Sequence, residues 1–375
     1  MLRPTTLCAA LWLLFTACDD DAPAGADAVA DVADQADVRR PDALPDHGFC
    51  PPVDAEPDVA SDADLDDGTD GARDAEAVAD ATELDATSPD AAVPDAVSPD
   101  AVAPDAGPLV WVPRRILTEE DGLSGPDGLF TVGPSCVLVA NEVGRQVLEI
   151  DVDALEVVVR VPAGGGLRAP EEVAVGPDGA IYVSDDSARA VFRVVDDEVE
   201  RILSADDGLE SPEGIAVGPD GSVYVADERA RLIVRLDPEG VLTTLADEDD
   251  GVFAPEGLAL GPDGTLYATD DRRGGVLAVD PEGVPRVFLG RDVLALPEAV
   301  AVAPSGDLWF TDNGGGAATL QRFTPAAEHQ ETVPMPVPAG QLAGIAVLPD
   351  GRLVVSVFRS REVHELWVVA REPMQ

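Results

Sequence analysis

The sequence predicts an all-β fold: a six-bladed β-propeller with four-stranded antiparallel blades, preceded by a long disordered segment. Two observations predict the propeller. A motif recurs about every 42 residues from residue 108 onward, and each repeat holds four short β-rich runs separated by turn residues. A third observation, the change in composition near residue 107, predicts the disordered segment. Helical periodicity is absent, which argues against a helical solenoid.

The repeat is marked by a Pro-Glu pair that precedes the predicted first strand in four of the units. These pairs begin at Pro170, Pro212, Pro255 and Pro297, at steps of 42, 43 and 42 residues. Gly-Pro-Asp-Gly turns or close variants follow at a fixed offset, and together they define six units. In the third unit the expected strands lie at 214–217, 223–225, 232–236 and 241–245.

One aromatic position recurs in the second strand of four repeats. It is held by Tyr182, Tyr224, Tyr267 and Trp309. We expect these rings to pack between neighbouring blades.

The last repeat offers only three strands, at 344–347, 353–357 and 364–369. The segment 111–117, near the start of the propeller, resembles the fourth strand of another repeat. We expect it to complete the sixth blade and so to remove an exposed sheet edge.

Residues 1–17 are expected to be a signal peptide, because one Arg precedes an apolar run that is too short to span a bilayer. The run ends in small residues before Cys18 and resembles the lipobox of bacterial lipoproteins. That resemblance implies cleavage before Cys18, lipidation of Cys18 and a place in the cell envelope, facing the periplasm or the exterior. The alternative is an ordinary cleaved signal with Cys18 incidental.

Residues 18–107 are rich in Ala, Asp and Pro and repeat Pro-Asp-Ala, so we expect a disordered tether. It leads into a propeller at 108–375. After processing, Cys50 and Cys136 would remain in a compartment where a disulfide can persist. A Cys50–Cys136 bridge and two unpaired thiols are both compatible with the sequence.

Composition excludes several functions. The net charge of −49 disfavours nucleic acid as a partner. All 24 basic residues are Arg, so Schiff-base and P-loop chemistry are excluded and no nucleotide cofactor is expected. Three His are present, and no Ser-His-Asp constellation is visible.

Two sets of acids are expected on one face of the propeller. The inner set lies just before the innermost strands and comprises Asp127, Glu171, Glu213, Glu256 and Glu298. Carboxylates around one channel mouth repel unless they are protonated, splayed apart or neutralised, and oxygen ligands suit Ca²⁺ or another divalent cation. The alternative is a solvated blade entry without a metal.

The outer set comprises Asp185, Asp227, Asp270 and Asp312, at the heads of turns. We expect these acids to accept backbone hydrogen bonds and to pair with the Arg that follows four residues later in some repeats.

Residues 212–227, followed by Arg231, closely resemble an NHL repeat, and the resemblance covers 108–375. It extends to gluconolactonase and regucalcin-like propellers and, more distantly, to streptogramin lyases. In regucalcin-like lactonases the position held here by Asp127, Glu213 and Glu256 coordinates the catalytic metal. The resemblance therefore implies a metal that polarises a lactone carbonyl while a carboxylate acts as base.

These families include hydrolases, lyases and binding modules, so fold alone assigns no function. Our leading hypothesis is a lipid-anchored, monomeric binding module for a protein partner or a small ligand, with a divalent cation at the mouth. The alternative is a metal-dependent lactone hydrolase of the gluconolactonase type.

Overall fold

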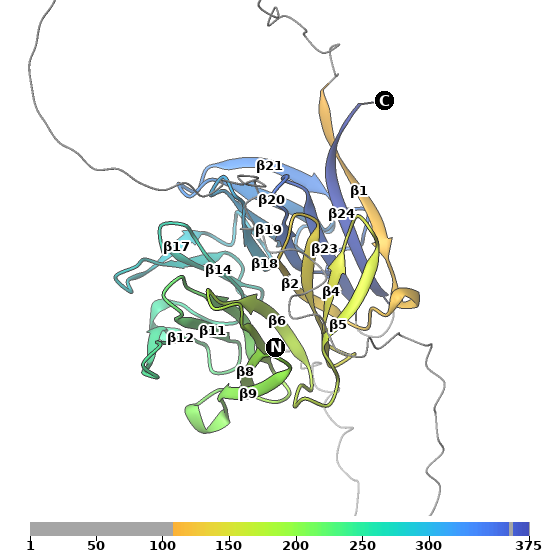
Figure 1. The fold of residues 1–375 in the computed structure, drawn as a ribbon. Coiled ribbons are helices and arrows are strands. Elements are labelled where there is room, and N and C mark those ends of the chain that lie inside the picture. The colour runs from red at the N-terminus through yellow and green to blue at the C-terminus, as the bar shows by residue number, and fades with distance from the viewer. Residues whose placement is uncertain (1–107, 360–362, 375) are drawn as a thin grey trace, which may run out of the picture. The chain divides into compact units, whose positions relative to one another are not determined.

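The computed structural model describes residues 108–359 and 363–374, which form six four-stranded antiparallel sheets (Figure 1). The predicted six-bladed propeller is therefore confirmed. The signal peptide, the tether, Cys18 and Cys50 lie outside the described residues. Five sheets run in chain order from a first strand beside the central channel to a fourth strand at the periphery, and in the sixth sheet the N-terminal β1 (Leu109–Leu117) takes the outermost place.

Blades 1 to 3 follow one another along the chain. Blade 1 contains β2 (Pro126–Thr131), β3 (Cys136–Asn141), β4 (Gln146–Asp151) and β5 (Glu156–Val161). Blade 2 contains β6 (Pro170–Val175), β7 (Ile181–Asp185), β8 (Ala190–Val195) and β9 (Glu198–Leu203). Blade 3 contains β10 (Pro212–Val217), β11 (Val223–Asp227), β12 (Leu232–Leu236) and β13 (Leu242–Ala246).

Blades 4 to 6 complete the ring. Blade 4 contains β14 (Pro255–Leu260), β15 (Leu266–Asp270), β16 (Val276–Val279) and β17 (Pro285–Leu289). Blade 5 contains β18 (Pro297–Val302), β19 (Leu308–Asp312), β20 (Thr319–Phe323) and β21 (His329–Pro334). Blade 6 contains β22 (Leu342–Val347), β23 (Leu353–Arg359), β24 (Val363–Pro373) and β1 (Leu109–Leu117).

The ring closes through β1, as the sequence predicted. β1 pairs antiparallel with β24, from Leu109 opposite Pro373 to Leu117 opposite Leu366, and the two strands lie side by side in Figure 1. The N-terminal strand thus covers the edge that β24 would otherwise expose.

The hydrophobic core is divided among the interfaces between adjacent blades. Tyr182 of blade 2 packs with Ile215 and Val225 of blade 3, and Trp309 of blade 5 packs with Leu353 and Val355 of blade 6. Tyr224 and Tyr267 occupy the corresponding positions at the next two interfaces. The predicted packing of this aromatic position between blades is confirmed.

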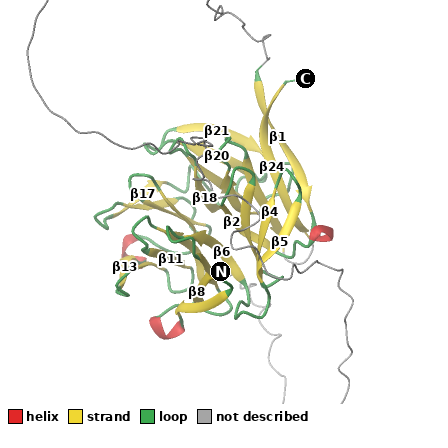
Figure 2. Cartoon of the chain, viewed as in Figure 1, coloured by secondary structure: helices red, strands yellow, loops and turns green. Residues whose placement is uncertain are grey.

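Turn chemistry explains the Gly-Pro-Asp-Gly motif. In the turn after β10, Gly221 has φ +84°, a left-handed conformation that glycine adopts without strain, and the Asp220 carboxylate accepts the Ser222 amide at 3.0 Å. Three short 3-10 helices, drawn red in Figure 2, connect blades: η1 (Glu119–Asp121), η2 (Ala205–Asp207) and η3 (Glu248–Asp250). Each begins with a capping box, at Thr118, Ser204 and Asp247.

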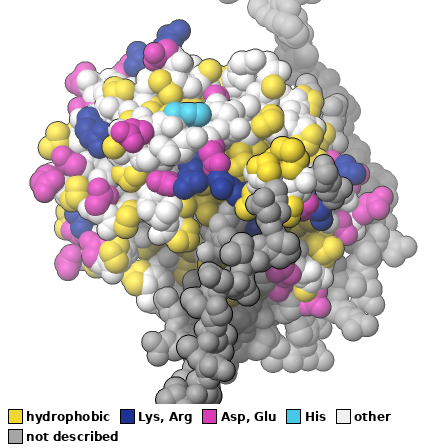
Figure 3. Space-filling view, turned by 90° about the horizontal axis from the view of Figure 1, so that it is seen from above, with side chains coloured by type: hydrophobic (Ala, Val, Ile, Leu, Met, Phe, Trp, Pro, Cys, Tyr) yellow, Lys and Arg dark blue, Asp and Glu magenta, His cyan; other side chains and the backbone are white. Residues whose placement is uncertain are grey.

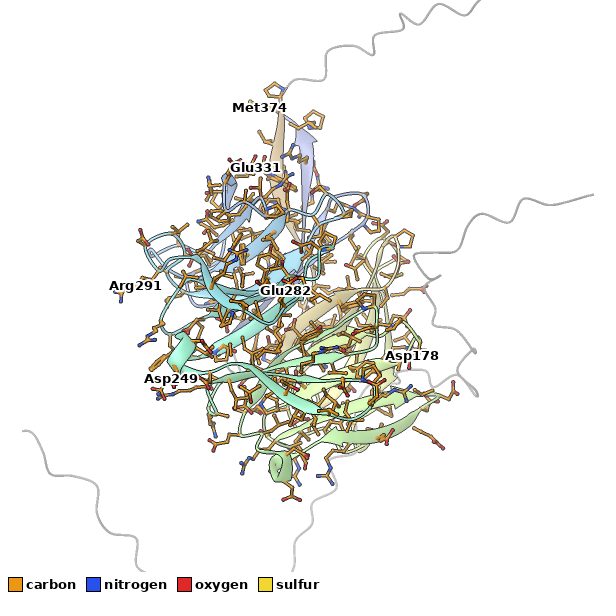
Figure 4. The ribbon with its side chains drawn as sticks, turned by 90° about the vertical axis from the view of Figure 1, so that its left-hand side faces the viewer. Asp178, Asp249, Glu282, Arg291, Glu331 and Met374 are labelled. Carbon is orange, nitrogen blue, oxygen red and sulfur yellow. The ribbon has the colours of Figure 1, made fainter. Side chains whose placement is uncertain are left out.

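Acidic and basic side chains are interspersed over the visible face in Figure 3. Asp249 and Arg291 project from the outer edge of the blades in Figure 4. Among the described residues, none forms a helix that is long and apolar enough to cross a membrane.

Candidate metal centre at the channel mouth

The five inner acids lie together at one mouth of the central channel. Asp127, Glu171, Glu213, Glu256 and Glu298 line a cavity of about 90 Å³, where Ala343 takes the sixth position. The structure therefore brings together every acid that the sequence placed at the innermost strands. The opposite end of the channel is lined by the Gly-Pro turns, as at Pro177 and Pro219.

A β-bulge places each acid at the mouth. In blade 3 the ladder between β10 and β11 runs from Pro212 opposite Asp227 to Ile215 opposite Val225, so Glu213 and Gly214 have no direct partners. The same irregularity occurs at the start of the first strand in all six blades. Bulges commonly redirect a side chain away from the ladder, and here they turn the acid toward the axis.

Glycine occupies the position after the inner residue in blades 1, 3, 4 and 6, where the first strands approach one another closely. A Cβ on Gly214 would lie 2.1 Å from the Glu256 carbonyl oxygen, and one on Gly344 would lie 2.4 Å from the Asp127 carbonyl oxygen. Hydroxyl groups bridge the same strands: Thr269 donates to the Glu298 carbonyl at 2.5 Å and Ser356 to the Asp127 carbonyl at 2.7 Å. The backbone under the carboxylates is thus tightly fixed.

A second tier of acids surrounds the first. Its members occupy the position directly after the second strand: Glu142, Asp186, Glu228 and Asp271, with Asn313 in blade 5. The acids predicted from the sequence end at the preceding residue and do not include this tier, although an acid recurs at this position in four repeats.

The two tiers meet most closely between blades 3 and 4. Carboxylate oxygens of Glu228, Glu256 and Asp271 lie within 4.8 Å of one another. Buried oxygens of Asp186 and Asp271 have no hydrogen-bond partner in the described structure. A hard cation would coordinate such unpaired carboxylate oxygens and neutralise their charge.

Few positive charges offset these acids. Arg272 forms an ion pair with Glu228, and it is the single described basic side chain with an ion pair to an acid of either tier. The remaining partners are neutral: Ser211 donates to Glu213 at 3.0 Å, and the Asn313 amide donates to Glu298 at 3.3 Å. Burial and the charge of Asp127 raise the pKa of Glu171, so these two neighbouring carboxyls resist being ionised together.

Burial raises the pKa of every inner carboxyl, and repulsion between neighbours adds to it. The pKa values of Asp127, Glu171, Glu213 and Glu256 are raised well above their ordinary range, first by burial and then by other carboxylates of the mouth. Burial followed by the charge of Asp271 raises the pKa of Glu298 to about 7. Burial likewise raises the pKa of Asp271 to about 6. The mouth resists full ionisation unless a cation enters it.

The outer aspartates are structural, as predicted. Asp227 is fully buried and accepts the amides of Glu210, Ser211 and Ala230 at 2.7–3.0 Å, which ties the loop before β10 to the turn after β11. Asp185 does the same in blade 2 with the amides of residues 168, 169 and 188.

The expected pairing of these acids with the Arg four residues later is wrong. Arg231 pairs with Glu248 of η3, and Arg189 donates to the Leu209 carbonyl. Both Arg have positive φ, 56° and 53°, so their side chains leave the turn toward the next blade. Backbone amides already satisfy the aspartate.

The sixth blade gives the mouth a less acidic side. Ala343 replaces the inner acid, and Phe358 replaces the second-tier acid. His364 lies nearby, where its Nδ1 accepts the Gly125 amide at 2.7 Å and its ring contacts Phe358. His329, on the peripheral β21, contacts Gln321 and Thr332 instead.

Cys136, at the start of β3, is buried and disulfide-bonded. Cys50 lies outside the described residues, so the Cys50–Cys136 bridge stays a prediction.

Solved structures with the same architecture share low sequence identity with this chain. A structure described as streptogramin B lyase has a TM-score of 0.54 and 14% identity, covering 70% of this chain and 98% of that one. A gluconolactonase from Xanthomonas campestris has a TM-score of 0.55 and 21% identity, covering 71% and 98%.

A third similar structure is a catalytically inactive variant of virginiamycin B lyase from Staphylococcus aureus, in which histidine is replaced by alanine, with quinupristin. It has a TM-score of 0.51 and 17% identity, covering 72% of this chain and 89% of that one. At these identities the likeness shows the fold alone. A comparison with curated protein sequences gives no match.

One family model spans most of the propeller. The model of the virginiamycin B lyase family matches residues 140–365, which is more than half of the chain. That match begins in blade 1 and ends in blade 6. The chain belongs to the virginiamycin B lyase family.

Proposed function

We propose that this protein is a lipid-anchored, extracytoplasmic binding module whose channel mouth holds a divalent cation and thereby recognises a small ligand or a protein partner. The observation that carries the proposal is the convergence of Glu228, Glu256 and Asp271, with oxygens within 4.8 Å of one another. Within the described part of the chain, an Asp271 oxygen is buried there without a hydrogen-bond partner.

Calcium fits this site better than other common cations do. The mouth offers carboxylates and, among the described side chains that line it, no His or Cys, which zinc and copper prefer. Ca²⁺ accepts irregular sets of about six to eight oxygens, whereas Mg²⁺ demands near-octahedral geometry.

The size of the mouth favours a cation over an organic molecule as its resident. Its cavity is about 90 Å³. Ligand pockets usually measure about 300–1,000 Å³. A ligand or partner would therefore sit above the cavity and reach the cation through its own oxygens.

Calorimetric titration of the EDTA-treated protein with Ca²⁺ tests the proposal. We expect one site that is weakened about tenfold or more by Glu256→Gln or Asp271→Asn. Glu282→Gln, on an exposed turn, removes one charge away from the channel and should leave the affinity unchanged. Absence of Ca²⁺ binding, or equal losses in all three variants, would contradict a site at the mouth.

Lactone hydrolysis is the second candidate. It is favoured by the closeness of Asp127 and Glu171 at the acidic mouth, because their repulsion favours a proton on one of the two carboxyls. A bound divalent cation would supply Lewis acidity to a lactone carbonyl. The Asp127–Glu171 pair would hold and transfer a proton, acting as general acid and base.

Hydrolysis of glucono-lactone in the presence of Ca²⁺ tests this candidate. Asp127→Asn should abolish the turnover while Ca²⁺ still binds. No turnover by the calcium-loaded wild type would leave the binding module as the function.

A lyase reaction is not proposed, although the family contains lyases. The similar Staphylococcus aureus structure is described as catalytically inactive when a histidine is replaced. In the part of the chain that the structure describes, His329 is peripheral and His364 is committed to the Gly125 amide.

Lipid anchoring is tested separately. Cys18→Ala should move the protein from the membrane fraction to the soluble fraction. Membrane association that persists in this variant would overturn the anchor at Cys18 without affecting the cation site.

A further inference from the structure

The channel contains a second cavity, distinct from the cavity at the acidic mouth. It measures about 570 Å³, within the usual range of small-molecule pockets, and it lies between the acidic mouth and the turn face. Aliphatic residues of the first strands line most of it, among them Leu129, Val175, Val217, Leu260 and Val302.

Of the side chains that the structure describes, one charged group reaches this cavity. Glu172 is the single acid among its lining residues, and it also lines the mouth cavity, so it stands between the two. The equivalent position is Gly128, Gly214, Gly257, Ala299 or Gly344 in the other five blades. Five blades therefore carry Gly or Ala at this position, and only blade 2 carries a long side chain.

The partners that face the Glu172 carboxyl are backbone amides, those of Ile215 and Leu258 on the first strands of blades 3 and 4. No Arg or His lines the cavity among the described residues. Two amides orient the carboxyl, but no cationic side chain among the described lining residues would offset its charge on ionisation, and nearby Asp127 opposes that ionisation.

We propose that the lower channel binds a small apolar amine, whose ammonium group pairs with the Glu172 carboxylate while its hydrocarbon part lies among the first-strand side chains. An ammonium supplies the missing counterion. An aliphatic tail would pack against the apolar lining, which offers water few hydrogen-bond partners. A carboxylate ligand would meet the acidic side chains without a cation between them, and a neutral alcohol would form no ion pair with Glu172.

Chain-matched probes test this proposal on the EDTA-treated full-length protein. Calorimetric titration with n-octylamine, n-octanol and octanoate at neutral pH should show tightest binding for the amine. Glu172→Gln keeps the shape and Glu172→Gly restores the residue of four other blades; both should weaken octylamine binding by about tenfold or more. Glu171→Gln, which changes the neighbouring acid at the mouth, should alter it less than about twofold.

Three results would overturn the proposal: no octylamine binding, equal binding of octanol, or equal losses in Glu171→Gln and Glu172→Gln, which would place the amine at the mouth. Val217→Trp provides an independent test, since a bulky side chain in the cavity should block octylamine. The calcium titration is a separate readout, so failure here leaves the cation site standing, and the reverse also holds.

Discussion

At the scale of single residues, adjacent acids in the same loop have different roles. Asp227 ends β11, and its carboxylate accepts hydrogen bonds from three backbone amides. Glu228, the next residue, lies with Glu256 and Asp271 at the mouth. The strand's alternation turns one side chain into the blade and the other toward the channel. A structural acid and a functional acid therefore follow each other in the sequence.

Asp227→Ala should lower the free energy of unfolding by about 3 kcal/mol, because it leaves several buried amides without an acceptor. Glu239→Ala, on an exposed turn of the same blade, should change it by less than about 0.5 kcal/mol. Urea denaturation measures both. Equal effects would show that the loop is held by something other than the aspartate.

At the scale of elements, β1 decides whether the ring is closed. It covers the edge of β24, and Trp111 on β1 packs edge-to-face on Trp309 of blade 5 with ring centroids 5.3 Å apart. The Arg371 guanidinium lies 4.8 Å from the Trp111 ring centroid on the same strand pair. The N-terminal strand thus ties the last blade to its neighbour through side chains as well as backbone.

Trp111→Ala should cost about 3 kcal/mol of unfolding free energy, since it opens a cavity between blades 5 and 6. Leu109→Ala lies on the same strand, but Leu109 is 53% exposed, so its loss should be below about 1 kcal/mol. Thermal denaturation of the two variants measures the difference. A similar melting temperature for both would contradict closure by packing.

At the scale of the whole molecule, the channel concentrates negative charge at one end. Burial, aided by Asp127, raises the pKa of Glu172 to about 8, and burial with Asp271 raises that of Glu298 to about 7. Between about pH 4.5 and pH 8 the folded protein therefore binds more protons than the unfolded chain does. Folding stability must fall as the pH rises through this window.

We expect the EDTA-treated protein to lose roughly 3–5 kcal/mol of unfolding free energy between pH 5 and pH 8. Glu172→Gln should lessen this loss. Calcium at about 100 times its dissociation constant should restore about 2.7 kcal/mol at pH 8. Melting curves with EDTA and with Ca²⁺ at both pH values measure these effects. Stability that rises with pH in EDTA would contradict the clustering of protonated carboxyls.

Much of the molecule could be predicted from the sequence because its repeats are local signals. The spacing of Pro170, Pro212, Pro255 and Pro297 gave the blade number, and turn residues gave the strands within each blade. The inner acids could be predicted because each lies at the start of a first strand in the sequence. The fold places the first strand of every blade beside the axis. Closure by residues 111–117 followed from the strand missing in the last repeat.

Tertiary structure alone decided what depends on distances between blades. The meeting of Glu228, Glu256 and Asp271 joins blades 3 and 4, and the reach of Glu172 to the amides of Ile215 and Leu258 crosses two blade boundaries. The rejected Asp–Arg pairing belongs here as well, because the left-handed turn at Arg231 directs its side chain to the next blade. Repeat spacing fixes each blade, but side-chain direction and inter-blade separation arise only when the ring closes.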